Sequence, residues 1–320
     1  MTFYRKVVWY TRGLKEYTKK GYEAAFKNFE SLDNIDLSGR AFMVTGANSG
    51  IGKEAALEVA KRGGTVHMIC RSEERGKQAQ QEIKDSCSNE NVHLHILDMS
   101  NPENVQGFAM KFIEDERPLH VLVNNAGCMV NDRQVDENGL EKNFATNTLG
   151  TYLLTTALAD HIKKHESPRV ITVTSGGMLL QKLDHEDLQF ERINPFDGTM
   201  AYAQNKRQQV VMTDFWAKKY PDIHFSTMHP GWADTPAVRN SMPDFHRKME
   251  GKLRTPAEGA DTLVWLCVSP EATKQPSGGF FQDRKTVKKH LPLAWTVSSE
   301  NDEASFMQKM EDLANKFRKK

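Results

Sequence analysis

Short apolar runs alternate with longer polar segments over most of the chain, from residue 40 onward. The runs lie at 41–44, 65–69, 92–97, 119–123, 170–173 and 223–228, with a further candidate at 278–282. Segments with helical spacing separate them, for example 53–62 and 104–115. Runs that are almost entirely apolar and alternate with helices indicate parallel strands buried on both faces. The pattern therefore predicts an α/β fold with a single doubly wound parallel sheet of about seven strands.

The first 30 residues follow a different pattern. Apolar residues recur there at alternating spacings of four and three, which predicts one amphipathic helix with a stripe of Phe3, Val7, Tyr10, Leu14 and Tyr17. Basic residues lie off this stripe, and Gly21 is expected to break or kink the helix. Two interpretations stay open. The stripe lies in a membrane interface with the basic side chains toward anionic headgroups, or it docks against the protein body or a partner subunit.

These patterns divide the chain into three parts. Residues 1–38 contain the basic amphipathic helix and a polar connector, and residues 39–290 form the α/β domain. Residues 291–320 form a charged tail that has helical character from 301 and a basic end.

The composition narrows the class of protein. The 320 residues include 43 basic and 42 acidic ones, so a net charge of +1 gives no reason to expect nucleic acid as a partner. Four cysteines without metal-ligand spacing predict a reduced intracellular protein with no metal site. No apolar stretch approaches the roughly 20 residues of a membrane span, and charges interrupt the N-terminus. We therefore expect a protein that is cytoplasmic or peripheral on a membrane, without a span and not secreted.

A glycine-rich segment directly follows the first predicted strand. It reads Thr45-Gly46-Ala47-Asn48-Ser49-Gly50-Ile51-Gly52 and leads into a predicted helix. Glycines at these positions allow a tight turn and let backbone N–H groups approach a pyrophosphate, and the helix N-terminus favours the anion. Its place between a strand and a helix, near the start of an α/β series, predicts a dinucleotide-binding loop.

The second predicted strand ends at Cys70-Arg71, without an acidic residue. A carboxylate there would hydrogen-bond the ribose hydroxyls of NAD, whereas a guanidinium can pair with the 2′-phosphate of NADP. Lys53 is a second, weaker candidate for that phosphate. The sequence favours NADP(H) as the cofactor, with NAD(H) as the alternative. The competing interpretation is a solvated Arg71 that merely opens the next helix.

Tyr202 and Lys206 are four residues apart, which on a helix puts both side chains on one face. Interconverting an alcohol and a carbonyl requires a group that gives or takes a proton as hydride moves. A free phenol has a pKa of about 10 and is a poor base at neutral pH. A neighbouring ammonium, together with the positive nicotinamide of the oxidised cofactor, is expected to lower that pKa. Such pairs are common on solvated helices. This one follows the glycine-rich loop and the fifth strand, which makes it a candidate acid–base pair.

The spacing Thr-Gly-x-x-x-Gly-x-Gly resembles the short-chain dehydrogenase/reductase superfamily, and the resemblance extends over about residues 40–285. Within it, the chain is similar to the retinol-dehydrogenase-like group. Residues 1–29, the Asn-Ala-Gly-Cys-Met segment and the Tyr-Ala-Gln-Asn-Lys-Arg-Gln-Gln-Val segment carry a closer match to one member of that group. The resemblance implies a Rossmann-type domain.

The resemblance also implies roles for individual residues. It places the catalytic serine at Ser175, where its hydroxyl would bind the substrate oxygen, and Thr174 replaces the first serine of the usual pair. It makes Asn147 a fourth catalytic residue, holding a water that connects Lys206 to solvent. It implies cofactor contacts at Asp98, Met99, Asn124, Ala126, Gly127, Tyr202, Lys206, Pro230, Gly231 and Thr235. Helix capping by Asp98, a turn role for Ser175 and a helix contact for Asn147 are the competing interpretations.

Further segments bear on the substrate. Residues 181–200 form a polar insertion, and 240–253 is a candidate lid. An apolar pocket, or else buried core, is indicated by Met178, Leu179, Leu180, Trp232 and Phe245. We expect an NADP-dependent oxidoreductase that transfers hydride between NADP(H) and a small lipophilic carbonyl or alcohol. The alternative is an NADP(H)-binding scaffold or sensor with little turnover, and a homo-oligomer stays open.

Overall fold

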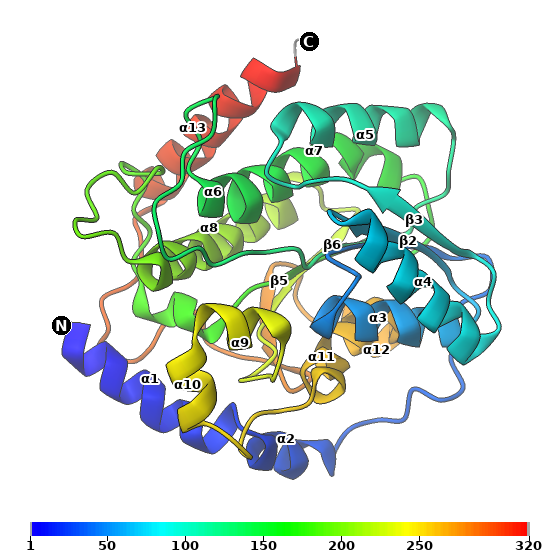
Figure 1. Ribbon diagram of the computed structural model, residues 1–320, viewed down its shortest axis with the longest axis horizontal. Coiled ribbons are helices and arrows are strands. Elements are labelled where there is room, and N and C mark those ends of the chain that lie inside the picture. Colours follow the sequence, from blue (N-terminus) through cyan, green and yellow to red (C-terminus); the bar gives the residue numbers. More distant parts are fainter. Residues whose placement is uncertain (1, 319–320) are drawn as a thin grey trace.

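Eight strands form a single sheet in the computed structural model, which describes residues 2–318 (Figure 1). The strand order is β3-β2-β1-β4-β5-β6-β7-β8. The strands are β1 Ala41–Thr45, β2 Thr65–Cys70, β3 Val92–Ile96, β4 Val121–Asn124, β5 Arg169–Val173, β6 His224–Met228, β7 Gly279–Gln282 and β8 Lys285–Thr286. β1 to β7 are parallel, and β8 pairs antiparallel with β7. The predicted class and its seven parallel strands are confirmed.

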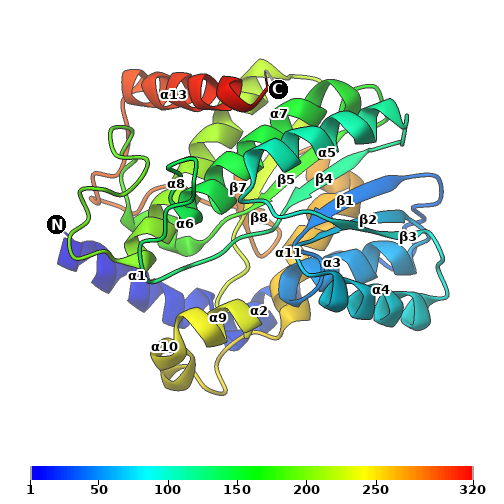
Figure 2. The same cartoon turned by 45° about the horizontal axis from the view of Figure 1, so that its top comes forward.

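Helices cover both faces of this sheet (Figure 2). One face carries α3 Gly50–Lys61, α4 Glu73–Cys87, α11 Pro256–Val268 and α12 Pro270–Thr273. The other carries α5 Pro102–Glu114, α6 Lys142–Phe144, η1 Ala145–Leu149, α7 Gly150–Ile162, α8 Gly198–Lys219 and α13 Glu300–Arg318. Shorter elements lie at the carboxyl ends of the strands, namely η2 Gly176–Leu180, α9 Pro236–Ser241 and α10 Pro243–Lys248.

The apolar strands belong to two cores at once. In β1, Met43 packs in the cluster shared with α5, α7 and α8, whereas Phe42 and Val44 pack in the cluster shared with α3 and α11. Successive side chains of a strand point to opposite faces, so a strand covered by helices on both sides needs apolar residues at every position. This is the physical reason for the continuous apolar runs in the sequence.

The N-terminal segment forms two helices, α1 Thr2–Glu16 and α2 Lys19–Phe26, and not the single helix predicted. The chain breaks at Tyr17-Thr18, where the Thr18 hydroxyl caps α2 by accepting the N–H of Gly21 at 3.4 Å. The expected break at Gly21 is wrong, because that glycine lies inside α2. The break is held in place by the N–H of Trp232, which donates to the Tyr17 carbonyl at 2.7 Å.

The face of α1 that contacts the body agrees with the predicted stripe only in part, at Tyr10 and Tyr17. Trp9, Gly13 and Tyr17 face the protein, while Phe3, Val7 and Leu14 are 81%, 44% and 41% exposed. Trp9 and Tyr17 contribute aromatic rings to this contact. The ring of Trp232 lies so close to Gly13 that a Cβ on Gly13 would be 2.3 Å from that ring. Close packing at Gly13 therefore turns this side of α1 to the body and leaves Phe3, Val7 and Leu14 of the stripe exposed.

The C-terminal segment ends in α13, which packs on α5 and α7 through Phe306, Met310 and Phe317. The Tyr152 hydroxyl donates to the Glu311 carboxylate at 2.6 Å across this contact. The charged tail thus has one apolar face in the main core, and its basic end at 319–320 lies outside the described residues. Within residues 2–318, no helix combines the length and the apolar character needed to cross a bilayer.

Candidate active site

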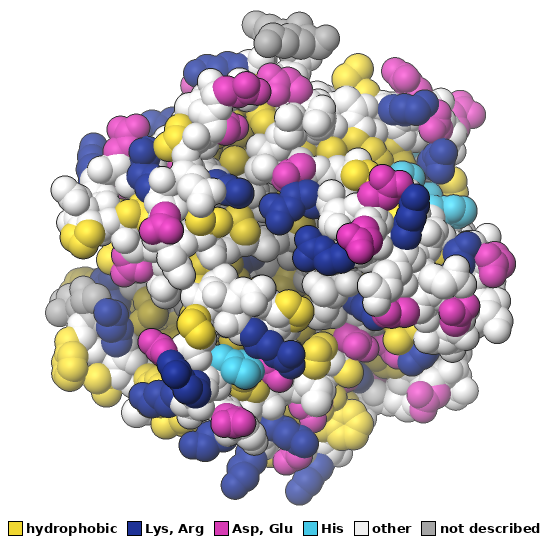
Figure 3. All heavy atoms as spheres, viewed as in Figure 1, with side chains coloured by type: hydrophobic (Ala, Val, Ile, Leu, Met, Phe, Trp, Pro, Cys, Tyr) yellow, Lys and Arg dark blue, Asp and Glu magenta, His cyan; other side chains and the backbone are white. Residues whose placement is uncertain are grey.

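The carboxyl ends of β1, β4, β5 and β6 meet at one edge of the sheet, where the predicted site residues come together. The strand order reverses between β1 and β4, and doubly wound sheets bind ligands in the crevice at such a point. Figure 3 shows a hollow near the middle of this face, with Lys and Arg side chains on its rim.

The glycine-rich loop makes the sharp turn that its sequence predicts. Gly46 and Gly50 have φ of +68° and +54°, a backbone region that favours glycine. A Cβ at Gly52 would lie 2.4 Å from Nδ2 of Asn125 and 2.6 Å from the carbonyl oxygen of Gly46. The loop therefore folds back tightly on the turn after β4, and side chains at these positions would fill the space beside the first turn of α3.

Thr45 and Asn124, both in the predicted cofactor set, and Asn125 between Asn124 and Ala126 make their polar contacts behind this loop. The buried Thr45 hydroxyl accepts the backbone N–H groups of Asn125 and Ala126, each at 2.9 Å. The Asn125 amide donates to the Thr45 carbonyl at 2.8 Å. The Asn124 amide points the other way and donates to Thr155 on α7 at 2.9 Å. Thr45 and Asn124 thus have side chains in the protein interior, and Asn125 shapes the loop.

The rest of the loop fits an anionic dinucleotide. Ser49, before α3, makes no side-chain cap to the first helical N–H groups, so these donors point to the crevice beside Asn48 and Ile51. Arg71 is exposed at the end of β2 and lies within electrostatic reach of Cys128. Lys53, in contrast, pairs with Glu82 on α4. The backbone donors and Arg71 are the groups that fit pyrophosphate and a 2′-phosphate, and Lys53 is already paired.

Asp98 and Met99 form the corner after β3. The Asp98 carboxylate accepts the N–H and hydroxyl of Ser100 at 2.9 and 2.8 Å, whereas Asn101 caps α5. Asp98 is therefore a turn residue, and the expected helix cap lies three positions later. The Met99 carbonyl lies only 2.1 Å from where a Cβ of Gly150 would be, so α7 begins directly against this corner.

Tyr202 and Lys206 lie one turn apart on α8, as their spacing predicts. Lys206 Nζ is 5.3 Å from the centroid of the Tyr202 ring and donates to the Val173 carbonyl at 2.8 Å. Lys206 is buried, while Tyr202 keeps some contact with solvent and its hydroxyl has no hydrogen-bond partner within residues 2–318. The phenol is thus the group of the pair that a substrate can reach.

The pKa values of this pair differ from the sequence-based expectation. Desolvation raises the pKa of Tyr202 above its usual range and lowers the pKa of Lys206 to about 7. In the chain by itself, desolvation outweighs the effect of the ammonium, which lies over the ring face, donates to other acceptors and is about half charged at neutral pH. The expected lowering of the Tyr202 pKa, to which the positive nicotinamide also contributes, stays a prediction.

A buried amide network supports Lys206 from behind. Gln209 accepts from Lys206 Nζ at 3.0 Å through its side-chain oxygen and donates to the Asn147 backbone carbonyl at 2.7 Å. Asn147 lies in the π-helical turn η1, where its side chain bonds the backbone N–H and carbonyl of Cys128, both at 2.8 Å. The sequence patterns predicted no functional role for Gln209. The signal was its position, three residues after Lys206 on the same helix face.

Ser175 lies at the end of β5, next to α8. Its Oγ accepts the N–H of Gly177 at 3.1 Å, and a Cβ on Gly177 would be 3.5 Å from that oxygen and 4.0 Å from Cβ of Ala203. The Thr174 hydroxyl donates to the Lys206 carbonyl at 2.9 Å. These contacts hold the end of β5, with Ser175, against the part of α8 that carries Tyr202 and Lys206.

Gly127, after β4, lies next to Asn147 and Lys206 in this site. It is exposed, yet a Cβ there would lie 3.1 Å from Oδ1 of Asn147 and 3.6 Å from Nζ of Lys206. The absence of a side chain leaves the buried Lys206 within reach of a molecule in the crevice. Beside it, the Thr235 methyl is 3.3 Å from where a Cβ of Gly50 would be, so the segment after β6 touches the glycine loop.

The turn after β6 has a structural histidine. His229 accepts the Gly176 N–H at 2.9 Å through Nδ1, and burial lowers its pKa to about 3. It is neutral and supports the Ser175 turn, as expected for a strand-end residue. Pro230 and Gly231 follow, and Gly231 has φ of +75° and faces Arg254.

The predicted apolar pocket is different from the observed mouth of the site. Met178 and Leu179, both in η2, and Trp232 are buried in core clusters against which residues of α1 pack. The apolar residues at the mouth are Met129, Val130, Met200 and Met242, each partly exposed or exposed. The Ser241 hydroxyl donates to the Met129 carbonyl at 2.9 Å, so the end of α9, where the candidate lid 240–253 begins, contacts the segment after β4.

The N-terminal segment is built into this site. The Trp9 indole donates to the Gly176 carbonyl at 2.8 Å, directly after Ser175. Arg254 binds Asp283 through two hydrogen bonds of 2.7 and 3.1 Å and donates to the carbonyl groups of Glu16 and Pro230. This buried guanidinium joins α1 to the turn that contains Gly231.

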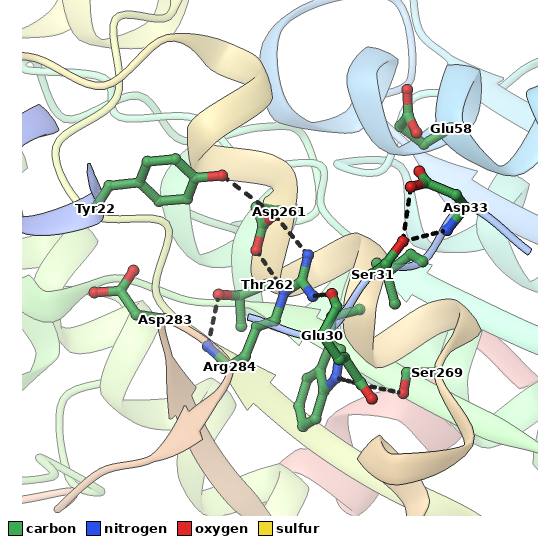
Figure 4. A network of polar contacts seen from close by, with 12 residues as sticks. Tyr22, Glu30, Ser31, Asp33, Glu58, Asp261, Thr262, Ser269, Asp283 and Arg284 are labelled. Carbon is green, nitrogen blue, oxygen red and sulfur yellow. Dashed lines mark hydrogen bonds and ion pairs between the residues drawn. The ribbon is translucent and has the colours of Figure 1, made fainter. Parts of the chain in front are cut away.

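A second network fixes the connector after α2 (Figure 4). Arg284 binds the Asp261 carboxylate with both hydrogen bonds at 2.8 Å and donates to the Glu30 carbonyl at 2.7 Å. Tyr22 donates to the same carboxylate at 3.2 Å, and the Ser269 hydroxyl donates to the Glu30 carboxylate at 2.7 Å. Residues far apart in the sequence thus hold the N-terminal segment against α11.

Comparison with known proteins shows close relatives over the whole chain. A family model described as short chain dehydrogenase matches residues 40–183. Dehydrogenase/reductase SDR family member 12 of Homo sapiens is 57% identical over 99% of this chain and 100% of its own length. Retinol dehydrogenase 12 of Mus musculus is 32% identical over 83% of this chain and 87% of its own length. The expected closer match to one member of the retinol-dehydrogenase-like group is confirmed.

Solved structures share the fold. A short chain dehydrogenase from Escherichia coli CFT073, complexed with NADPH, has a TM-score of 0.63 and 24% identity, over 78% of this chain and 98% of its own. Other structures of comparable similarity are described with NADP or with NADH.

Proposed function

The chain belongs to the short-chain dehydrogenase/reductase family, and from this premise we propose that it interconverts a lipophilic carbonyl compound and its alcohol, with NADP(H) supplying or accepting the hydride. The observation that carries the proposal is the position of Tyr202. Its hydroxyl is the one unengaged polar group of the Tyr202–Lys206–Ser175 cluster within residues 2–318, and it lies at the crevice beside the glycine loop. A phenol there can exchange a proton with a substrate oxygen.

Each residue has a part in this chemistry. Ser175 orients the substrate oxygen through its hydroxyl, and Tyr202 donates the proton when a carbonyl is reduced. Burial raises the pKa of Tyr202, which keeps the phenol protonated and so favours the donor role. The phenolate that remains after donation is stabilised by the positive charge of Lys206, 5.3 Å from the ring.

The cofactor preference rests on the end of β2. The glycine loop and the start of α3 offer backbone donors to a pyrophosphate, and Arg71 follows β2 where NAD-binding domains place a carboxylate. A guanidinium supports a 2′-phosphate, so we propose NADP(H), with NAD(H) as the alternative. Exchanging Arg71 for Asp is expected to weaken NADPH binding and to leave NADH binding intact or improved.

A lipophilic substrate is supported by the residues at the mouth. Met129, Val130, Met200 and Met242 give that opening an apolar lining with flexible side chains, which suits an apolar compound of variable shape.

The test is NADPH oxidation with a panel of lipophilic aldehydes and ketones, for the protein and for Tyr202→Phe. We expect turnover that falls about 10²- to 10⁴-fold in this variant while NADPH binding, followed by cofactor fluorescence, is retained. Tyr220→Phe, at the residue that follows the same helix, is the matched control and should keep full activity. NADPH binding without turnover on the panel, and none with alcohols and NADP⁺, would favour the alternative of a cofactor-binding scaffold or sensor.

A further inference from the structure

Large apolar side chains are concentrated on the surface beside the N-terminal end of α1. Phe3 is 81% exposed, and Leu293, Trp295 and Val297, in the loop between β8 and α13, are 75%, 72% and 65% exposed. Together with Tyr4 and Val7 they form what is here named the apolar patch. We propose that the apolar patch docks the protein on the surface of an anionic lipid bilayer. The proposal does not rest on the catalytic function.

The two segments of the apolar patch are in direct contact although they are almost 290 residues apart. Tyr4 donates to the Pro292 carbonyl at 3.1 Å, and Arg5 donates to the carbonyl groups of Ala294 and Trp295 at 2.7 and 3.4 Å. Both ribbon views show the loop before α13 running beside the first turns of α1 (Figures 1 and 2). The exposed residues therefore form one continuous surface.

The loop is anchored in a way that holds its apolar side chains outward. Leu291, Ala294 and Thr296 are 4%, 1% and 0% exposed, and His290 bonds the Thr296 hydroxyl at 2.9 Å. Leu293 and Trp295 have φ of 53° and 52°, a left-handed conformation that is unfavourable for residues other than glycine. Their exposure is thus imposed by a fixed loop and maintained against a conformational cost, which is typical of a functional surface.

The charges around the apolar patch suit anionic headgroups. Residues 2–20 include six basic residues and one acidic residue, and residues 284–299 include four basic residues and no acidic one. Lys6, Lys285 and Lys288 are exposed and form no ion pair within the described part of the chain. Figure 3 shows further Lys and Arg side chains along the lower edge, near the end of α1 and over α2, with some Asp and Glu side chains among them. Apolar and aromatic side chains bordered by lysines are what binding at a bilayer interface requires.

The same charges argue against dimerisation of the chain through the apolar patch. Pairing two apolar patches would bring basic segments of like charge together, which opposes association. An anionic bilayer, in contrast, is complementary to both the apolar side chains and the lysines. The opposite face of α1 remains on the protein, where Trp9 contacts the turn after Ser175, so docking needs no rearrangement of the site.

The test is co-sedimentation of the full chain with vesicles of phosphatidylcholine alone and with added phosphatidylserine. We expect binding to the anionic vesicles that weakens as salt is raised, and a loss of at least about ten-fold in the double variant Leu293→Ser/Trp295→Ser. The matched control is Ile96→Ser/Met110→Ser, which removes two apolar side chains that are 50% and 51% exposed on β3 and α5. It should bind as the unchanged protein does.

Two results would overturn the proposal. One is equal vesicle binding by the double variant and the unchanged protein. The other is no vesicle binding together with a concentration-dependent dimer, measured by sedimentation velocity, that the double variant loses. NADPH turnover in vesicle-free solution is measured in parallel, so failure of lipid docking and failure of the catalytic proposal are separate outcomes.

Discussion

The side-chain amide of Gln209 bridges Lys206 and Asn147, accepting from Lys206 Nζ at 3.0 Å and donating to the Asn147 carbonyl at 2.7 Å. All three residues are buried, and the amide oxygen is one of two acceptors that the Lys206 ammonium has. Gln209 is therefore a positioning residue that holds the Lys206 ammonium against η1.

Substitutions of Gln209 with opposite electrostatic effects should shift the pH profile in opposite directions. Gln209→Met removes the acceptor and should lower the pKa of Lys206, whereas Gln209→Glu adds a negative charge and should raise it. The alkaline limb of kcat/KM for NADPH is expected to move to lower pH in the first variant and to higher pH in the second. Shifts of the same sign in both would mean that Gln209 acts only through packing.

The pH dependence of carbonyl reduction should follow Lys206. Its pKa of about 7 means that the ammonium is charged below that pH and loses its proton as pH rises, while burial keeps Tyr202 protonated throughout. We expect kcat/KM for NADPH, which reports the free enzyme, to fall above about pH 7 by up to about ten-fold per pH unit. Lys206→Arg, which stays charged, should have no such limb even if its activity is lower.

Gly231→Ala should destabilise the protein far more than Gly251→Ala. Both glycines have positive φ, +75° and +71°, but a Cβ at Gly231 would lie 2.4 Å from Nε of Arg254, whereas Gly251 has open space. Displacing Arg254 disturbs its buried pair with Asp283, at a cost of about 3–5 kcal/mol in the free energy of unfolding. The strain alone at Gly251 should cost about 1–2 kcal/mol.

Urea unfolding followed by circular dichroism measures both values. Equal losses in the two variants would show that only backbone conformation matters at Gly231 and that Arg254 moves without cost.

Trp9→Phe should weaken catalysis while leaving cofactor binding unchanged. The substitution keeps an aromatic ring but removes the indole N–H that donates to the Gly176 carbonyl at 2.8 Å. Loss of one hydrogen bond, about 1 kcal/mol, is expected to lower kcat/KM for the carbonyl substrate roughly five-fold by loosening the Ser175 turn. Trp295→Phe is the control, because that ring is 72% exposed and far along the chain from this turn. An unchanged kcat/KM in Trp9→Phe would mean that α1 is not needed to position Ser175.

Local patterns in the sequence were sufficient to predict the parallel sheet, the glycine loop and the Tyr202–Lys206 pair. The seven parallel strands follow from continuous apolar runs, because each strand must satisfy a core on both faces. The glycine loop follows from positions where a side chain would collide, as at Gly52, and the Tyr202–Lys206 pair follows from one helical turn. These features depend on neighbours within a few residues, so the amino-acid order alone determines them.

Only the tertiary structure decided which partner each side chain meets. Gly13 lets Trp232 approach α1, which leaves the apolar side chains on its other side exposed, and Arg254 fixes the break after Glu16. Thr45 and Asn124 turn into the interior, while Gln209 reaches Lys206 and Asn147. Burial also raises the pKa of Tyr202 in the chain by itself, an effect that the spacing of the pair does not reveal. Close packing and desolvation arise from segments that are distant in the chain, and no local pattern of residue types specifies which of them will meet.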